Sequence, residues 1–128
     1  MKQPDEDDWG KLKRVLQYLK GTRTLKLRLT VDGMHCIKWL VDASHRVHWD
    51  CKGHTGAAMT LGEGATSSFL HKHKQNAKSS TEYKLYGVYD ALPKVMWSLE
   101  FLRAQGHDVS HALMYQDNKN AILLEVNG

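Results

Sequence analysis

The spacing of the apolar residues changes period several times along this chain of 128 residues, and the order of these periods constrains the fold most. A helical period around Trp9 is followed by the alternation typical of a strand over 24–31, and by short strand-like segments within 36–70. Helical spacing returns after Ser79, and a short strand pattern then separates it from a last helix. Such a succession favours a mixed α/β layer fold.

Capping and turn residues predict where these elements begin and end. Asp8 and Gly21 are placed to cap a first helix over 9–20. The capping-box spacing from Ser79 to Glu82 predicts a helix start, and Pro93 should stop or kink that helix and open another one. The other expected elements are strands over 24–31, 36–41, 57–61, 65–70 and 110–116, a helix over 93–105, and a last helix over 118–126 capped by Asp117 and Asn118.

Apolar spacing also predicts the core. The helix after Pro93 should bury one face that carries Val95, Leu99 and Leu102. All four tryptophans lie within apolar patterns, so we expect them in the core rather than at a surface that stacks on bases. They are Trp9, Trp39, Trp49 and Trp97.

The charge is distributed unevenly. The chain has 18 Lys and Arg against 14 Asp and Glu, a net charge of +4. Four of the acids and one of the bases lie in the first eight residues, so the part from Trp9 onward carries 17 basic and 10 acidic residues, or +7. This balance favours an anionic partner, with nucleic acid as the first candidate; a solvated basic surface is the simpler alternative.

Composition excludes several classes of protein. No apolar run approaches the roughly 20 residues that span a bilayer, and the first residues do not form a signal peptide. Two cysteines, Cys36 and Cys51, are too few for a disulfide scaffold. We therefore expect an intracellular protein, in the cytoplasm or the nucleus, with no membrane partner.

Two carboxylates follow predicted strands. Asp42 comes after the strand 36–41, and Asp117 comes after the strand 110–116. If these strands are parallel neighbours, their carboxyl ends meet at one edge of the sheet, where open α/β sheets bind ligands. Paired carboxylates there suit Mg²⁺, and two such ions can drive phosphodiester hydrolysis. The structural alternatives are that Asp42 begins a turn and Asp117 caps a helix.

Four motifs follow one another in a consistent order: Leu40-Val41-Asp42-Ala43-Ser44, His54-Thr55-Gly56, Ser79-Ser80-Thr81-Glu82-Tyr83 and Tyr115-Gln116-Asp117-Asn118. Together they resemble the ribonuclease H domain of copia-type retrotransposon polyproteins. The leading segment 9–22 resembles the helix just upstream of that domain. The resemblance implies an α/β fold with a ribonuclease H-like mixed sheet flanked by helices. Residues 1–30 would form a basic helix and strand, and 31–128 a domain that lacks its C-terminal part, in one folded unit.

Domains of this family cleave the RNA strand of RNA–DNA hybrids with two Mg²⁺ (or Mn²⁺) ions. Asp42 and Asp117 match two of the metal-binding acids, but Lys84 stands where the family has a glutamate, and the fourth acid is expected beyond Gly128. Glu82 is no substitute, because two residues turn a helix by about 200°. The resemblance therefore implies an intact fold with impaired or absent catalysis. We expect the Lys84 ammonium to form ion pairs with Asp42 and Asp117.

The segment 71–78, just before the helix that carries Lys84, is basic and could contact a nucleic-acid backbone or the 2′-hydroxyls of RNA. The expected contact residues are Lys72, Lys74, Asn76, Lys78 and Ser79. The implied partners are an RNA–DNA hybrid or duplex nucleic acid and the rest of a Pol polyprotein. Two alternatives stay open: a non-catalytic module that binds proteins, and an active nuclease with an altered metal set.

Overall fold

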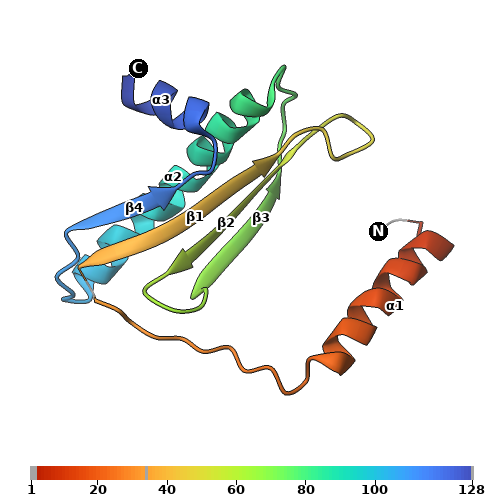
Figure 1. The fold of residues 1–128 in the computed structure, drawn as a ribbon, viewed down its shortest axis with the longest axis horizontal. Coiled ribbons are helices and arrows are strands. Elements are labelled where there is room, and N and C mark those ends of the chain that lie inside the picture. Colours follow the sequence, from red (N-terminus) through yellow and green to blue (C-terminus); the bar gives the residue numbers. More distant parts are fainter. Residues whose placement is uncertain (1–2, 34, 128) are drawn as a thin grey trace.

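A mixed four-stranded sheet with one long helix across it forms the body of the computed structural model, which describes residues 3–33 and 35–127 (Figure 1). Its elements, in chain order, are α1 (Glu6–Gly21), β1 (Cys36–Ser44), β2 (His54–Thr60), β3 (Ser67–Lys72), α2 (Ser80–Ala104), β4 (His111–Tyr115) and α3 (Lys119–Asn127). The strand order is β3-β2-β1-β4, with β1 parallel to β4 and the other pairs antiparallel. The predicted class, α/β with a mixed sheet flanked by helices, is confirmed and is consistent with a ribonuclease H-like fold.

The strands β1, β2 and β3 form an antiparallel meander, and each overlaps a predicted strand. In β1 the alternate residues Ile37, Trp39 and Val41 are buried, as a half-buried strand requires. The structure extends the meander beyond the predicted ends, because His54 pairs with both Ser44 and Lys72. The second strand of the meander, β2, therefore begins at His54, three residues before the start of the predicted strand over 57–61.

Helix α2 starts at the predicted capping box. The Glu82 amide donates to the Ser79 hydroxyl at 3.2 Å, and the Glu82 carboxylate accepts from the Lys78 amide at 2.6 Å. The predicted break at Pro93 is wrong, since α2 continues through it to Ala104. Pro93 is exposed and removes only the bond to the Tyr89 carbonyl, on a side of the helix where water can hydrate that group.

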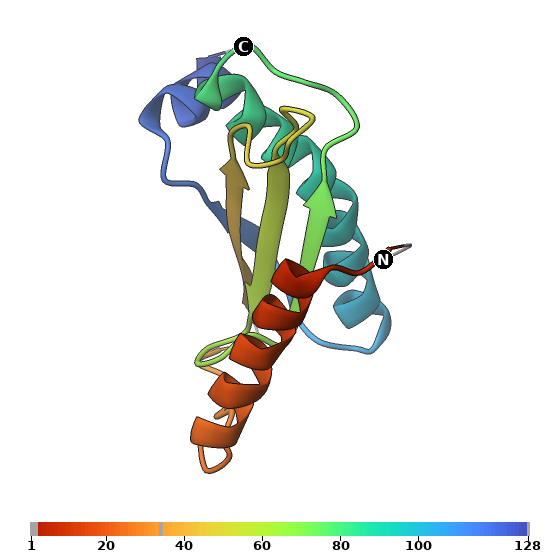
Figure 2. The same cartoon turned by 90° about the vertical axis from the view of Figure 1, so that its right-hand side faces the viewer.

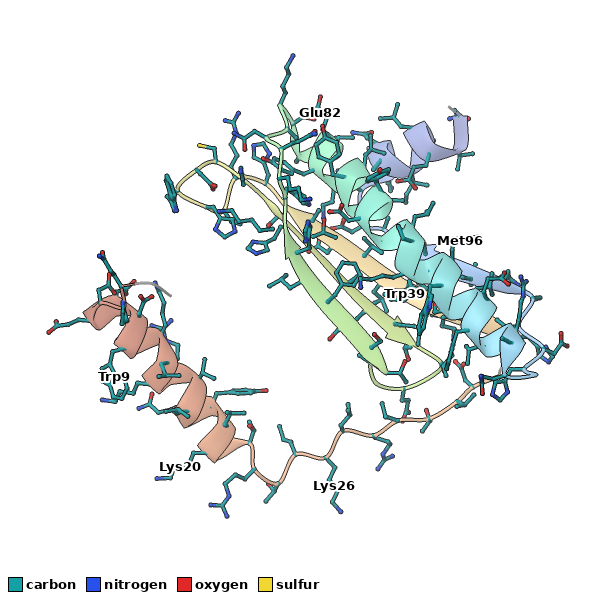
Figure 3. The ribbon with its side chains drawn as sticks, turned by 180° about the vertical axis from the view of Figure 1, so that it is seen from behind. Trp9, Lys20, Lys26, Trp39, Glu82 and Met96 are labelled. Carbon is teal, nitrogen blue, oxygen red and sulfur yellow. The ribbon has the colours of Figure 1, made fainter. Side chains whose placement is uncertain are left out.

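The core lies between α2 and one face of the sheet, and Figure 2 shows α2 along that side. Val95 and Leu99 are buried there, as predicted, against the inward residues of β1. Trp39 is 2% exposed, and its indole Nε1 donates to the Ser98 hydroxyl at 3.3 Å. Figure 3 shows this side chain in contact with α2. Trp39 thus anchors the sheet to the helix.

The prediction that the other three tryptophans lie in the core is wrong. Trp97 is 66% exposed because it lies on the side of α2 away from the sheet, where it stacks on Phe101. Trp49 lies in the turn between β1 and β2, and Trp9 lies on α1, which stands apart from the sheet (Figure 3). Apolar spacing alone therefore does not identify the buried face when a helix has a second apolar face.

Helix α1 forms as predicted, with different caps. The Asp8 amide donates to the Asp5 carboxylate at 2.9 Å, so Asp5 rather than Asp8 is the N-cap. At the other end Gly21 is still helical, and Thr22 is the C-cap. Within the described residues, α1 packs against no other helix or strand.

The predicted strand over 24–31 is not formed. This segment is extended, and the Thr30 amide donates to the Glu63 carbonyl in the turn between β2 and β3. The Asp32 amide, just after the segment, donates to Leu61 of the same turn. Leu25 is 72% exposed. Alternating leucines give the segment a strand pattern, but a strand also needs a partner edge, and these residues lie beyond the sheet (Figure 1).

Candidate carboxylate and lysine site

Asp42 and Asp117 meet at one edge of the sheet, as the sequence predicts. In the parallel pair of β1 and β4, Leu40 lies opposite Tyr115, and two further residues along each chain bring Asp42 level with Asp117. Both carboxylates border a hollow of about 340 Å³ between the diverging chains and are largely exposed. Asp42 lies within β1, which continues to Ser44, so it does not begin a turn.

Asp117 does not cap α3. That role belongs to Asn118, whose side-chain Oδ1 accepts a hydrogen bond from the Ala121 amide at 3.0 Å. The Asp117 carboxylate is instead turned toward Lys84, which donates to it at 2.8 Å. The structural alternative that the sequence left open for Asp117 is therefore wrong.

Lys84 lies between the two carboxylates. It stands in the second turn of α2, and its Nζ donates to Asp42 as well as to Asp117. The Lys84 side chain is only 13% exposed. Its backbone carbonyl accepts a hydrogen bond from the side-chain amide of Gln116 at 3.4 Å. The expected ion pairs are thus present.

A glycine brings α2 close to β1 at this point. A Cβ at Gly87 would lie 3.1 Å from the Ala43 Cβ, which is tighter than ordinary van der Waals contact. The absence of a side chain lets the first turns of α2 approach the strand that carries Asp42. This approach is what brings Lys84 within reach of both acids.

The electrostatics of the cluster favour a charged Lys84 and an ionised Asp117. Burial acts to lower the pKa of Lys84, but its hydrogen bonds to Asp117 and Asp42 outweigh burial and raise that pKa above its ordinary value. The hydrogen bond from Lys84 also lowers the pKa of Asp117. At neutral pH an ammonium therefore stands between two carboxylates, where it offsets their repulsion. This donor set fits an ion-pair cluster rather than a magnesium site, which needs oxygen ligands around the cation.

Neither Glu82 nor Asp90 joins Asp42 and Asp117 in this cluster. Glu82 is engaged at the start of α2, as described above, and Asp90 accepts a hydrogen bond from Thr55 at 3.0 Å on another side of the helix. Among residues 3–33 and 35–127, no group of three or more His, Cys, Asp or Glu side chains is arranged to hold a metal ion. Among the described residues, the Lys84 ammonium is the positively charged group paired with both Asp42 and Asp117.

The predicted nucleic-acid contacts line the end of β3 and the segment that leads into α2. Lys72 is bound to Asp50 at 2.9 Å, and the Ser79 hydroxyl is used as the helix cap. The other three predicted residues, Lys74, Asn76 and Lys78, are exposed. Within the described part of the chain, neither Lys74 nor Lys78 forms an ion pair.

Sequence reasoning missed one polar cluster, in which His73 bonds to Thr55 beside Asp90. His73 lies within a basic run and has the sequence signature of an exposed residue, yet it is 4% exposed. No local signal in the sequence marks it. His73 is buried because aromatic rings of α2 pack against its side chain.

The fold and site define a class: a mixed α/β domain in which an acid within one strand and an acid just after the neighbouring parallel strand face the first turns of a helix. Over 138 aligned residues that include 99% of this chain, the sequence is 30% identical to the Retrovirus-related Pol polyprotein from transposon RE2 of Arabidopsis thaliana. The chain spans 9% of that polyprotein. No protein-family model matches the chain. The similarity supports an origin in a retrotransposon Pol polyprotein.

No helix in residues 3–33 and 35–127 is both long enough and apolar enough to cross a bilayer.

Proposed function

We propose that this chain is a ribonuclease H-like domain of a retrotransposon Pol polyprotein that binds an RNA–DNA hybrid or duplex nucleic acid and does not cleave it. The observation that carries this proposal is the Lys84 ammonium bound between Asp42 and Asp117. The similarity to a retrotransposon Pol polyprotein over nearly the whole chain supports the domain assignment.

The proposed loss of catalysis follows from charge. Metal-dependent phosphodiester cleavage needs cations that activate the attacking water and stabilise the leaving oxygen. An ammonium cannot take oxygen ligands around itself as Mg²⁺ does, and it repels a divalent ion from the two remaining carboxylates. Mg²⁺ or Mn²⁺ therefore has no role in this proposal, and the acids serve as partners of Lys84.

The proposed binding follows from the basic segment beside α2. Lys74 and Lys78 are exposed and free of ion pairs within the described residues, so their ammonium groups can contact phosphates. The exposed Asn76 amide offers both a donor and an acceptor to a 2′-hydroxyl. Lys72 and Ser79 are engaged elsewhere in the fold, so they contribute less than the sequence alone implies.

A binding and cleavage assay on the purified chain tests the proposal. We expect a hybrid with a labelled RNA strand to bind with an affinity that falls as salt rises, and its RNA to remain intact in Mg²⁺. The proposal is overturned if the chain cuts the RNA with Mg²⁺ and loses that activity on Asp42→Asn substitution.

A second candidate function, protein binding, is favoured by α1. Its apolar side chains Trp9, Leu12, Leu16 and Leu19 are all about half exposed or more, and α1 packs against no other described element. An apolar stripe of this kind is typical of a protein-contact surface. The absence of any nucleic-acid affinity at low salt, in a chain shown by circular dichroism to be folded, would leave this function as the better account.

A further inference from the structure

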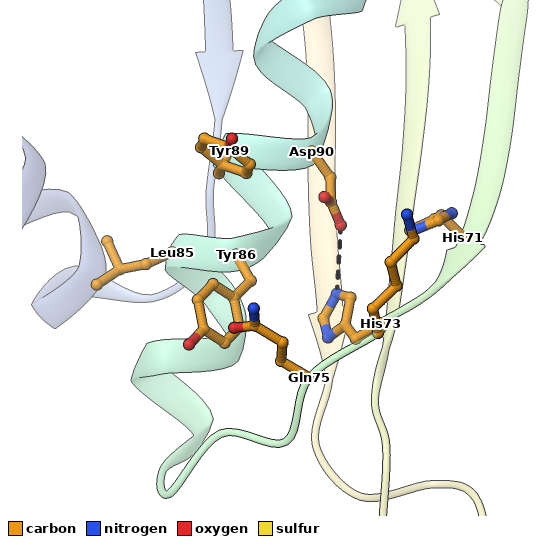
Figure 4. A pocket seen from close by; sticks show the side chains of 8 residues that line it. His71, His73, Gln75, Leu85, Tyr86, Tyr89 and Asp90 are labelled. Carbon is orange, nitrogen blue, oxygen red and sulfur yellow. Dashed lines mark ion pairs between the residues drawn. The ribbon is translucent and has the colours of Figure 1, made fainter.

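A cavity of about 620 Å³ lies between α2 and the segment that follows β3, lined by residues that are distinct from the carboxylate and lysine site. Its volume is in the range of small-molecule sites. Figure 4 shows its walls, with tyrosines and Asp90 from α2 on one side and two histidines and Gln75 on the other. The lining residues are His71, His73, Lys74, Gln75, Leu85, Tyr86, Tyr89 and Asp90.

The hydrogen bonds of Thr55 determine which nitrogen of His73 carries the proton. The Thr55 hydroxyl donates its single proton to the Asp90 carboxylate, which can only accept, at 3.0 Å. The same hydroxyl oxygen lies 2.5 Å from His73 Nε2 and must therefore accept from it. Burial lowers the pKa of His73 and outweighs the nearby Asp90 carboxylate, which acts to raise it. This direction favours the neutral ring, in which Nδ1 is a hydrogen-bond acceptor.

This Nδ1 atom is buried and has no hydrogen-bond partner among the described residues. The side chain is only 3% exposed and is fixed by stacking on Tyr83, with ring centroids 5.1 Å apart. In Figure 4 the ring lies between Asp90 and Gln75, with the second nitrogen on the side toward Gln75. Buried acceptors without a donor are rare in folded proteins, so a group that enters the cavity and donates a hydrogen bond would satisfy it.

The walls and the rim indicate what kind of molecule carries that donor. Tyr86 and Tyr89 offer aromatic rings to a planar group, and the Tyr89 ring is 78% exposed. Lys74 and His71 supply positive or hydrogen-bonding groups on the opposite wall. A planar ring, an N–H donor and a negative charge occur together in a nucleotide.

We propose that this cavity binds an unpaired nucleotide, with an N–H of the base donated to His73 Nδ1 and the phosphate near Lys74. The base would lie against the tyrosines of α2. This goes beyond the proposed function, because a duplex has no unpaired base to insert. The cavity and the basic segment proposed to bind the hybrid share only Lys74, so either binding proposal can fail while the other holds.

The test uses Tyr89→Ala, which removes an exposed ring and leaves the fold intact, and Tyr18→Ala on α1 as the matched control, since Tyr18 is 66% exposed. The ligands are adenosine monophosphate, a short single-stranded RNA, and a blunt RNA–DNA hybrid. The readouts are binding by calorimetry and the ¹⁵N shift of His73 Nδ1, which moves when that nitrogen accepts a hydrogen bond.

We expect saturable binding of the single strand, a shift of the His73 signal, and an affinity loss of about 5- to 150-fold in Tyr89→Ala, which is the range for one stacked base. Blunt-hybrid binding should be unchanged in Tyr89→Ala, and the Tyr18→Ala control should behave as wild type. If adenosine monophosphate binds in addition to the single-stranded RNA, the cavity is a site that also accepts free nucleotides. The proposal is overturned if neither the single-stranded RNA nor adenosine monophosphate binds, or if the His73 signal does not move. It is also overturned if Tyr89→Ala and Tyr18→Ala lose affinity equally.

Discussion

Replacing Lys74 and Lys78 together by glutamine should weaken the salt dependence of hybrid binding without unfolding the chain. Both side chains are exposed, and neither forms an ion pair within the described residues, so the substitutions break no internal contact. Glutamine keeps much of the length and loses the charge. Any change in binding therefore reports lost contacts with phosphates.

The size of the effect follows from the number of charges removed. Each phosphate that a lysine neutralises on a duplex contributes about 0.9 to the slope of log affinity against log salt, so the double variant should lose about 1.8. Between about 50 and 200 mM salt, a slope change of that size alters the affinity ratio of wild type to variant by roughly 12-fold. The expected loss of affinity is thus largest at low salt.

The assay is fluorescence anisotropy of a labelled RNA–DNA hybrid over a series of salt concentrations, with Lys72→Gln as the matched control. Lys72 is bound to Asp50 at 2.9 Å, so its removal should lower the slope by clearly less than about 0.9. The reasoning is refuted if the double variant keeps the wild-type slope. It is equally refuted if Lys72→Gln alone changes the slope as much as the double variant does.

Two further predictions concern the fold. Trp39→Ala should lower the free energy of unfolding in urea by about 3–5 kcal/mol because Trp39 is 2% exposed, whereas the exposed Trp97→Ala should change it by less than about 0.5 kcal/mol; similar losses in both would contradict the assigned core. Burial lowers the pKa of His73 and of His54, so the unfolded state binds more protons below pH 6.5, their ordinary pKa, and stability should fall as the pH drops below that value. Chemical unfolding at several pH values tests this, and a steeper fall in His73→Gln than in wild type would contradict it.

The parts of the fold that were predicted correctly depend on local patterns. The alternation in β1 and the capping box at Ser79 are complete within a few residues, so the strand and the helix start can be read directly. The juxtaposition of Asp42 and Asp117 needed one further assumption, that β1 and β4 are parallel neighbours, and the register confirms it. The family resemblance, rather than any local pattern, places Lys84 beside these acids, and the ion pairs expected from it are present.

The failures share a physical cause, which is that local patterns do not say what covers a segment. Pro93 lies inside α2 at an exposed position, and Tyr89, whose carbonyl it leaves without a helical partner, is exposed as well. Trp97 is exposed because it lies on the side of α2 away from the sheet. The segment 24–31 has a strand pattern without a partner strand. His73 shows the opposite error, since a residue in a basic run is buried by a helix that follows it in sequence.

The central claim is that the Lys84 ammonium occupies the place of a metal cation, and the most direct test is a Mg²⁺ titration of Lys84→Glu followed by calorimetry. The account predicts no saturable Mg²⁺ binding by the wild-type chain and a gain of binding in Lys84→Glu, where three carboxylates face one another. Lys84→Met, which removes the ammonium without adding an oxygen ligand, should bind Mg²⁺ more weakly than Lys84→Glu. Saturable Mg²⁺ binding by the wild type that is lost in Asp42→Asn, or no gain in Lys84→Glu, would contradict the account.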